Sequence, residues 1–431
     1  MRPRVLVIAE AANPEWASVP LIGWELTCAL REVADVHLVT HVRNREAIAR
    51  RGWAEGRDFT SIDNEGFAVP LFRLASSLGA GDGKGWTTIS AFAALAYYSF
   101  ETEVWRRFGP SLRDGQFDLV HRVTPVSPTC QSILARRLKK DGIPFVLGPL
   151  NGGVPWPPGF RHRQYAEREW LSHLRSLYKL LPGYASTRMN SSAILVGSGF
   201  TRDDMPRATR DKCIYLPENG INPHLFNKPR AGPAKLPLRG AFVGRLVPYK
   251  GADLLIRAAE PFLKSGRMSL EIIGDGPQRN ELAELISSLD LGAWIRLHGW
   301  VPHGQVQDIL RTCDFLGFPS VREFGGGVVL EAMALGLAPI VAHYGGPAEL
   351  VDDECGIRVQ FDDEQSLVEN FTKEFTRIAQ TPSLLDKLGA VAINKVNEKY
   401  TWPRKAEQIL NVYEALLAGG PGAGTLTCET G

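Results

Sequence analysis

Short apolar runs rich in β-branched residues alternate with longer amphipathic stretches along most of the chain. In the first half the short runs are RVLVIAE, DVHLVT, FDLVH, PFVLG, AILVGS and IYLPE, and in the second half they are GAFVGRL, SLEIIGD, WIRLHGW, FLGFPS, APIVAH and GIRVQ. This alternation predicts βαβ units, in which parallel strands form a sheet with helices on both faces. Because the series occurs twice, we expect two doubly wound, Rossmann-like α/β domains.

A polar, proline-rich interval, NPHLFNKPRAGPAKLPLRG, separates the two series. We therefore predict an N-terminal domain over residues 1–225 and a C-terminal domain over 226–400. Residues 401–417 are expected to form a last helix that packs back across the hinge, and the glycine-rich tail 418–431 is expected to be disordered. The two domains would face each other across a cleft, with a ligand at the carboxyl ends of both sheets.

The composition is that of an ordinary globular protein with a sizeable core. There are 49 Lys and Arg against 47 Asp and Glu, which leaves a net charge of +2, and 44% of the residues are apolar. A charge so small and evenly spread does not favour nucleic acid as a partner, since such binding relies on clustered phosphate contacts. The 6 cysteines include no C-x-x-C pair, which indicates free thiols rather than a zinc site or a disulfide framework.

The location of the protein is also constrained by its apolar segments. The N-terminal sequence MRPRVLVIAEAANPE has too few apolar residues for the core of a signal peptide. The longest apolar run, Ile89–Phe100, is shorter than the roughly 20 residues that a membrane-spanning helix needs. We therefore expect a cytoplasmic protein. The stretch 160–181 combines a leucine-rich face with basic residues such as Arg163, so it fits either a core-packed helix or a weak contact with the inner membrane face.

The stretch FPSVREFGGGVVLEAMALG predicts a strand, Phe315–Phe318, that leads through three glycines into a helix beginning near Val328. Such a junction presents unpaired backbone N–H groups and the positive end of a helix dipole to an anion. Glu331, inside the helix, and Glu323, on the loop, carry carboxylates that can accept hydrogen bonds from sugar hydroxyls. The alternative is a glycine-rich turn with two solvated acids.

Two other strand ends carry related signals. In FVGRLVPYKG a strand ends at Gly244, and the cations Arg245 and Lys250 that follow can neutralise a diphosphate, unless they merely border the strand. Because the chain has no Asp-x-Asp pair to hold a bridging metal ion, we expect these fixed charges to replace a metal, and we expect no cofactor. In EIIGDGPQ, Gly274 and Gly276 predict a tight turn through which a planar base could approach the backbone.

Taken together, GRLVPYKG, IIGDGP, the E-x7-E pair of Glu323 and Glu331, and HYGGPAELV resemble the nucleotide-binding half of the family-4 retaining glycosyltransferases of GT-B fold. The resemblance covers about Gly240 to Val359. It implies that Arg245 and Lys250 bind the diphosphate of the donor, that Glu331 binds the ribose, and that Glu323 with the following loop binds the transferred sugar. The donor-binding set predicted in this way is Gly244, Gly274, Gly276, Phe324, Gly325, Gly326, Gly327, Val328 and Glu331.

One departure from the family concerns the loop. The family usually reads E-G-F-G, whereas this chain reads Glu323-Phe324-Gly325-Gly326, so the aromatic residue stands one position earlier. After the loop, the glycines and the acid of HYGGPAELV look like the structural continuation that the family has there.

The N-terminal half resembles the family more loosely. It resembles a subgroup that carries G-W after the first strand, here Gly23 and Trp24, and a second glycine loop, here GPLNGG at 148–153. Gly23, Trp24 and Asn151 are the predicted acceptor- or sugar-binding residues, and Asn151 would take the polar role that a histidine has in many relatives. His121, which ends the strand FDLVH, is the candidate catalytic or sugar-binding histidine, although a lone histidine at a strand end is more often structural.

The sequence thus predicts a two-domain GT-B enzyme that moves a sugar from a nucleotide diphosphate-sugar to an acceptor hydroxyl with retention of configuration. The acceptor would be a small molecule, a glycan or a lipid-linked molecule. The mechanism implied by the resemblance is front-face displacement, in which Arg245, Lys250 and the helix N-terminus stabilise the leaving diphosphate and Glu323 positions the sugar. The alternatives are a nucleotide-sugar epimerase or hydrolase on the same scaffold and a non-catalytic nucleotide-sugar binding protein. The sequence does not name the base, the sugar, the acceptor or the oligomeric state.

Overall fold

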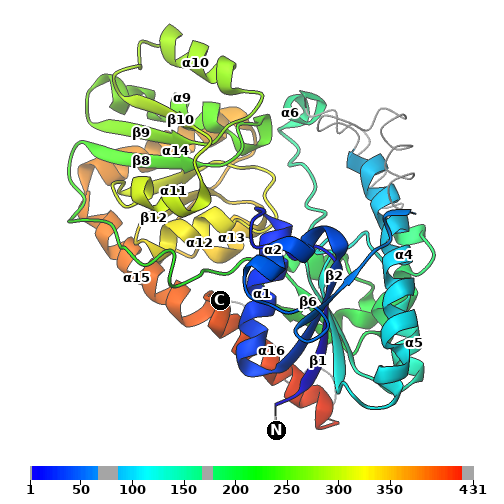
Figure 1. The fold of residues 1–431 in the computed structure, drawn as a ribbon. Coiled ribbons are helices and arrows are strands. Elements are labelled where there is room, and N and C mark those ends of the chain that lie inside the picture. Colours follow the sequence, from blue (N-terminus) through cyan, green and yellow to red (C-terminus); the bar gives the residue numbers. More distant parts are fainter. Residues whose placement is uncertain (1, 67–85, 167–177, 420–431) are drawn as a thin grey trace. The chain divides into compact units, whose positions relative to one another are not determined.

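The computed structural model describes residues 2–66, 86–166 and 178–419, without the side chains of 86–95 (Figure 1). The chain forms two compact units. The first unit comprises Met1–Gly153, Arg168–Glu218 and Trp402–Gly431, and the second comprises Val154–Glu167 and Asn219–Thr401. The main crossing between the units therefore lies a few residues before the expected boundary at 225/226. The short segment Val154–Glu167 belongs to the second unit, although it interrupts the sequence of the first.

The first unit is built on a seven-stranded parallel sheet in the order β3-β2-β1-β4-β5-β6-β7. Its strands are β1 (Arg4–Ala9), β2 (Asp35–His41), β3 (Phe59–Ile62), β4 (Leu119–Thr124), β5 (Phe145–Leu150), β6 (Ala193–Val196) and β7 (Cys213–Tyr215). Its helices are α1 (Val19–Val33), α2 (Arg45–Arg50), α4 (Trp86–Arg113), α5 (Leu134–Lys140), α7 (Tyr184–Asn190), α8 (Gly199–Asp204) and α16 (Trp402–Leu417), with the short 3-10 helices η1 (Val42–Asn44) and η3 (Arg207–Lys212).

Helices cover both faces of this sheet, which explains why its strands are apolar at consecutive positions rather than at alternate ones. Val5 and Val7 of β1 pack in one core cluster with residues of α1 and α16, whereas Leu6 and Ile8 pack in another with residues of α4 and α5. The last helix, α16, lies against α1 (Figure 1). The C-terminal helix that the sequence predicts thus completes the core of the first unit.

The second unit has a six-stranded parallel sheet in the order β10-β9-β8-β11-β12-β13. Its strands are β8 (Leu238–Val243), β9 (Met268–Ile273), β10 (Ile295–Gly299), β11 (Phe315–Phe318), β12 (Ala338–Ala342) and β13 (Ile357–Val359). Its helices are α6 (Arg161–Ala166), α9 (Ala252–Lys264), α10 (Arg279–Ser288), α11 (His303–Leu310), α12 (Gly327–Ala334), α13 (Gly345–Leu350), α14 (Glu364–Gln380) and α15 (Ser383–Lys399), with the 3-10 helix η4 (Pro248–Lys250).

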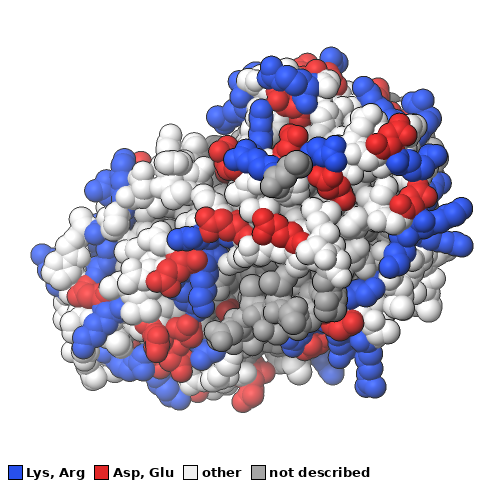
Figure 2. Space-filling view, turned by 90° about the horizontal axis from the view of Figure 1, so that it is seen from below, with Lys and Arg blue, Asp and Glu red and all other residues white. Residues whose placement is uncertain are grey.

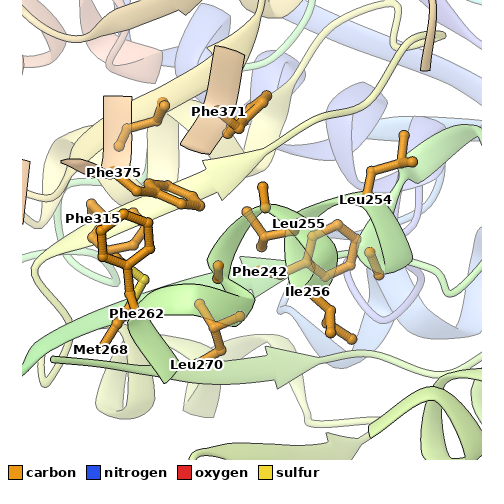
Figure 3. Close-up of a cluster of buried hydrophobic side chains, with 14 of the residues drawn as sticks. Phe242, Leu254, Leu255, Ile256, Phe262, Met268, Leu270, Phe315, Phe371 and Phe375 are labelled. Carbon is orange, nitrogen blue, oxygen red and sulfur yellow. The ribbon is translucent and has the colours of Figure 1, made fainter. Parts of the chain in front are cut away.

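Large aromatic side chains hold this sheet against its helices (Figure 3). The ring of Phe375 on α14 lies 5.5 Å from that of Phe315 on β11 and 6.2 Å from that of Phe262 on α9, measured between ring centres. Fully burying one such side chain contributes about 1.5–3 kcal/mol. The result is a rigid platform, from which the loops at the carboxyl ends of the strands project.

In both sheets the first strand lies in the interior. Later strands are added first on one side of it and then on the other, which is the doubly wound order. The predicted fold class, two Rossmann-like α/β domains, is therefore confirmed. In the second unit the reversal lies between β8 and β11, and this switch point is where open α/β sheets bind ligands. The cleft between the domains stays a prediction.

Other expectations from the sequence concern the helices and thiols. None of the helices in the described ranges is long and apolar enough to span a membrane, and the run Ile89–Phe100 lies within α4. Five of the cysteines lie in the described part of the chain, all as free thiols. Most of the predicted disordered tail, residues 420–431, lies outside the described residues.

Candidate functional site

The turn after β8 carries both cations that the sequence assigns to a diphosphate. Arg245 is exposed at the end of the strand. Lys250 ends η4, with its ammonium 5.2 Å from the centre of the Phe318 ring, and it forms an ion pair with Glu323. Burial lowers the pKa of Lys250 to about 8, while the facing carboxylate favours the charged form. Lys250 is therefore a cation at neutral pH.

The ion pair joins two loops that the sequence keeps apart. Lys250 follows β8 and Glu323 follows β11, so the pair straddles the switch point of the second sheet. Only 14% of the Lys250 side chain and 19% of the Glu323 side chain are exposed. The sequence assigned Lys250 to the diphosphate and Glu323 to the sugar and did not predict that they pair. A diphosphate would have to displace Glu323 from the ammonium.

Helix α12 begins at the glycine run, one residue before the predicted start. Its N-cap is Gly326, whose φ of 60° is left-handed, and no side chain caps the helix. A Cβ atom on Gly327 would lie 3.1 Å from Asn219 Oδ1, so a side chain here would require Asn219 to shift by a few tenths of an ångström. Val328 stands in the first turn. The backbone N–H groups of this turn are the donors that an anion would meet.

Two glycines of HYGGPAELV pack against the loop that carries Glu323. Cβ atoms on Gly345 and Gly346 would lie 2.4 Å from Glu323 O and 1.9 Å from Phe324 O, distances that no side chain could keep. Gly346 N donates a hydrogen bond to Glu323 O at 3.2 Å. The glycines thus let α13 support the loop directly, as expected of a structural continuation.

The turn after β9 packs on the turn after β8. A Cβ atom on Gly274 would lie 1.9 Å from Gly244 O, and one on Gly276 would lie 2.4 Å from Leu246 O. Leu246 N also donates to Asp275 O at 2.9 Å. The space beside these glycines is therefore filled by the turn after β8. The sequence analysis had instead expected a planar base to approach the backbone there.

Glu331 has a partner that sequence reasoning missed. Its Oε1 lies 2.7 Å from Nε2 of His303, the first residue of α11, and the His303 ring lies 5.3 Å from that of Phe226. The sequence did contain a signal for this contact. His303 follows the end of a strand and begins a helix, so it lies at the same edge of the sheet as Glu331. One carboxylate oxygen of Glu331 is thus held by this contact.

The aromatic residue of the glycine loop also has an unpredicted partner. The guanidinium carbon of Arg322 lies 5.8 Å from the centre of the Phe324 ring and 5.4 Å from that of Trp156. Both contacts have cation–π geometry. No periodicity could have revealed this set, because Trp156 stands far from the loop in sequence.

The expected acceptor-binding residues Gly23 and Trp24 lie inside α1 rather than on a loop. A Cβ atom on Gly23 would lie 2.1 Å from Ala11 O, so the glycine allows α1 to pack on the chain after β1. Trp24 is buried in the core, and its ring lies 5.0 Å from that of Trp53. This core packing gives no support to the predicted role of Trp24 in binding an acceptor or sugar, which stays a prediction.

His121 does not end its strand, as the sequence suggested, because β4 continues to Thr124. The side chain is completely buried, with Nδ1 2.5 Å from Tyr413 Oη and Nε2 2.7 Å from Gly148 O. Since the carbonyl can only accept, Nε2 carries the proton and Nδ1 accepts from the tyrosine. Burial lowers the pKa of His121 to about 4. A neutral imidazole with both nitrogens engaged gives no support to a catalytic or sugar-binding role.

Asn151 is buried at the end of β5 and uses its amide within the first unit. Its Nδ2 donates to Glu218 Oε2 at 2.7 Å, and its Oδ1 accepts from Ser198 Oγ at 3.0 Å and Gly152 N at 2.9 Å. These contacts hold the glycine loop in place. They account for the polar residue at this position without a bound sugar.

The stretch 160–181 is only partly described, since residues 167–177 lie outside the described ranges. Helix α6 covers Arg161–Ala166. Arg163 is buried and paired with Asp253 and Glu364, so of the two alternatives this residue fits packing inside the protein rather than contact with a membrane. Phe160 likewise lies in the core of the second unit.

Charged side chains and potential metal ligands are dispersed over the described residues. Within these ranges no group of three His, Cys, Asp or Glu side chains could hold a metal ion. Figure 2 shows acidic and basic side chains interspersed on the face in view, rather than a stripe of one sign.

The second unit is a doubly wound domain with a cationic turn, an acidic loop and a helix N-terminus without a side-chain cap at its switch point, which is where ligands bind in sheets of this kind. The comparisons agree. Residues 232–377 match the family model described as Glycosyl transferases group 1, so the second unit carries a domain of that kind.

Two curated relatives illustrate the match. An uncharacterized glycosyltransferase of Methanocaldococcus jannaschii is 31% identical over 218 residues, which cover 48% of this chain and 54% of the relative. Alpha-maltose-1-phosphate synthase of Mycolicibacterium smegmatis is 27% identical over 252 residues, which cover 53% of this chain and 64% of the relative. The chain thus spans less than two thirds of the length of these relatives.

Solved structures match over nearly the whole chain. The Anabaena protein HepE, in complex with UDP and glucose, has a TM-score of 0.60 at 16% identity, covering 96% of this chain and 100% of HepE. Sucrose-phosphate synthase from Thermosynechococcus elongatus has a TM-score of 0.60 at 18% identity, covering 97% and 100%. At this identity the likeness shows the fold, which is the GT-B fold. Both the matched domain and the fold are therefore shared with glycosyltransferases.

Proposed function

We propose that the chain is a retaining glycosyltransferase that moves a sugar from a nucleotide diphosphate-sugar to an acceptor hydroxyl. The observation that carries the proposal is the ion pair of Lys250 and Glu323 at the switch point of the group 1 domain. It brings a cation suited to a diphosphate and a carboxylate suited to sugar hydroxyls to one place. Glu331, on α12 of the same domain, would accept hydrogen bonds from the ribose.

In the proposed reaction the bond between the anomeric carbon and the diphosphate oxygen breaks, and the acceptor oxygen bonds to that carbon on the same face. The acceptor proton passes to the leaving phosphate oxygen. Arg245, Lys250 and the N-terminus of α12 stabilise the negative charge that grows on the diphosphate. Glu323, once displaced from Lys250, orients the sugar. This mechanism needs no protein base, which agrees with the engaged state of both nitrogens of His121.

The donor and acceptor are proposed only as classes. The complexes of HepE with UDP and glucose make UDP-sugars the first donors to test. The acceptor would be a hydroxyl of a small molecule, a glycan or a lipid-linked molecule. No metal ion is required, since Arg245 and Lys250 supply the positive charge.

The test is release of nucleotide from UDP-, GDP- and TDP-sugars with and without a panel of acceptors. Release that depends on an acceptor supports a transferase, whereas turnover without one points to a hydrolase or an epimerase. Tight binding of a nucleotide sugar with no turnover across the panel points to a binding protein. With an α-linked donor, NMR should show an α-linked product, and a β-linked product would contradict the retaining mechanism.

A further inference from the structure

Residues 154–166, here called the strap, belong to the second unit. Gly159 forms an isolated bridge with Asp363, and a Cβ atom on Gly159 would lie 2.4 Å from Asp362 O, so a glycine permits this approach. Phe160 is completely buried, with its ring 5.4 Å from that of Phe361. The strap is thus bound to the glycosyltransferase domain by backbone pairing and by core packing.

Arg163 of the strap holds the turn that carries Lys250. Its Nη1 donates to Pro248 O at 2.6 Å and to Asp253 Oδ1 at 3.0 Å, and its Nη2 donates to Asp253 Oδ2 at 2.6 Å. Pro248 begins η4, which ends at Lys250, and Asp253 lies in the first turn of the helix that follows. Arg163 therefore forms hydrogen bonds with the chain on both sides of Lys250. With 8% of its side chain exposed, it does so from a buried position.

Trp156 of the strap touches both loops of the candidate site. Its ring lies 6.3 Å from that of Tyr249, which directly precedes Lys250. The guanidinium of Arg322, which directly precedes Glu323, lies over the Trp156 ring at 5.4 Å and near the Phe324 ring at 5.8 Å. Arg322 thus links the strap to the loop of Glu323.

We propose that the strap is a positioning element of the donor site, in which Arg163 sets the position of Lys250 and Trp156 sets the position of the Glu323 loop through Arg322. The inference rests on the proposed function. It also explains the shifted aromatic of the glycine loop, because Phe324 packs on Arg322, which in turn packs on Trp156. Neither strap residue acts on substrate directly.

The two contacts predict different kinetic effects. Trp156→Ala loosens the loop proposed to hold the sugar, so kcat/KM for the nucleotide sugar should fall by ~10- to 100-fold, as expected when a reacting group is displaced by about 1 Å. Its Kd for the released nucleoside diphosphate should change less than kcat/KM, because Arg163 still holds the Lys250 turn after the contact between Trp156 and Tyr249 is lost. Trp156→Phe, which keeps an aromatic face, should recover most of the activity. Arg163→Gln loosens the Lys250 turn and should weaken binding of the nucleoside diphosphate as well.

Arg230→Gln is the matched control. Arg230 lies in the same unit with 10% of its side chain exposed and also bridges two carboxylates, those of Asp314 and Asp386. Removing it should lower the melting temperature without changing KM or Kd, because its partners are not part of either loop. A purely structural role of the strap would give its variants this same pattern.

The experiment measures melting temperature, steady-state kinetics and calorimetric Kd for whichever of UDP, GDP and TDP the wild-type enzyme releases. Unchanged kcat/KM in Trp156→Ala, which removes a half-buried side chain and is expected to fold, overturns the inference even if Arg163→Gln does not fold. Equal losses of sugar turnover and diphosphate binding in Trp156→Ala overturn its assignment to the sugar side. A wild-type chain that neither binds nor releases a nucleotide contradicts the proposed function itself, and the strap proposal with it.

Discussion

Replacing Glu323 by Gln should have opposite effects on product binding and on turnover. The Glu323 carboxylate forms an ion pair with the ammonium of Lys250, so a diphosphate must compete with this carboxylate for the ammonium. The amide removes the competitor and keeps the shape of the side chain. Binding of the nucleoside diphosphate should therefore tighten, while sugar transfer should slow, because the carboxylate that orients the sugar is lost.

The size of the gain follows from the burial of the pair. Exposed ion pairs contribute about 0.2–1 kcal/mol, and breaking a fully buried pair costs about 3–5 kcal/mol. With 14% and 19% of the two side chains exposed, the pair lies between these limits. We expect about 1–2 kcal/mol, which corresponds to roughly 5- to 30-fold tighter binding of the diphosphate.

Calorimetric titration of the wild-type and Glu323→Gln chains with UDP at pH 7 measures this gain, and nucleotide release measures turnover. Because the gain requires Lys250, the double variant Lys250→Ala/Glu323→Gln should bind UDP no better than Lys250→Ala alone. Weaker binding of UDP by Glu323→Gln would refute the reasoning, since it would mean that the carboxylate assists the diphosphate rather than competing with it.

The pH dependence of the same titration supplies an internal check. Burial lowers the pKa of Lys250 to about 8, and only the ammonium attracts a diphosphate. Affinity of Glu323→Gln for UDP should therefore be full below pH 8 and fall about tenfold for each pH unit above it. An affinity that does not change between pH 7 and 9.5 would contradict the role given to Lys250.

Further predictions concern the donor site, His121 and the need for a metal ion. Lys250→Ala and Arg245→Ala should each lower kcat by about 10²–10³, measured by nucleotide release, because they stabilise charge that develops as the diphosphate leaves. Glu331→Ala should raise the KM for donor with little change in kcat, since ribose contacts are the same before and during reaction; a fall in kcat alone would contradict this assignment. His121→Ala should keep measurable turnover but lose about 1–3 kcal/mol of unfolding free energy, because Tyr413 loses its buried partner. Burial lowers the pKa of His121 to about 4, so between about pH 6.5 and 4 the unfolded chain binds a proton that the folded chain does not. The unfolding free energy of wild type should therefore fall by up to ~3 kcal/mol over this range. Urea unfolding should show that His121→Gln lacks this fall. Addition of a chelator should leave turnover unchanged, and loss of activity that a divalent cation restores would contradict transfer without a metal.

Local patterns determined much of the fold. The strand predicted over Phe315–Phe318 is β11 with the same bounds, and the last helix ends at Leu417 as expected. These elements depend on hydrophobic periodicity and on glycine and proline breaks, which are properties of neighbouring residues. The doubled βαβ pattern likewise indicated two parallel sheets, because parallel strands need helical crossovers.

The sequence also placed Arg245, Lys250, Glu323 and Glu331 on loops at the carboxyl ends of strands or just inside the following helix, where a ligand of a doubly wound sheet would meet them. It misjudged the surroundings of His121 and Trp24. A histidine near the end of an apolar run does not reveal whether the strand continues past it, and a tryptophan beside a glycine does not reveal which face of its helix is buried.

Three features were decided by the tertiary structure alone. Lys250 pairs with Glu323 because the strand order places β8 beside β11. His121 contacts Tyr413 in the core because the last helix returns to the first unit. The strap joins the second unit through Arg163 although it interrupts the sequence of the first. Each feature is a contact between residues far apart in the chain, fixed by strand order, crossover and shape complementarity. Periodicity records only which side of a segment is buried and not what it is buried against.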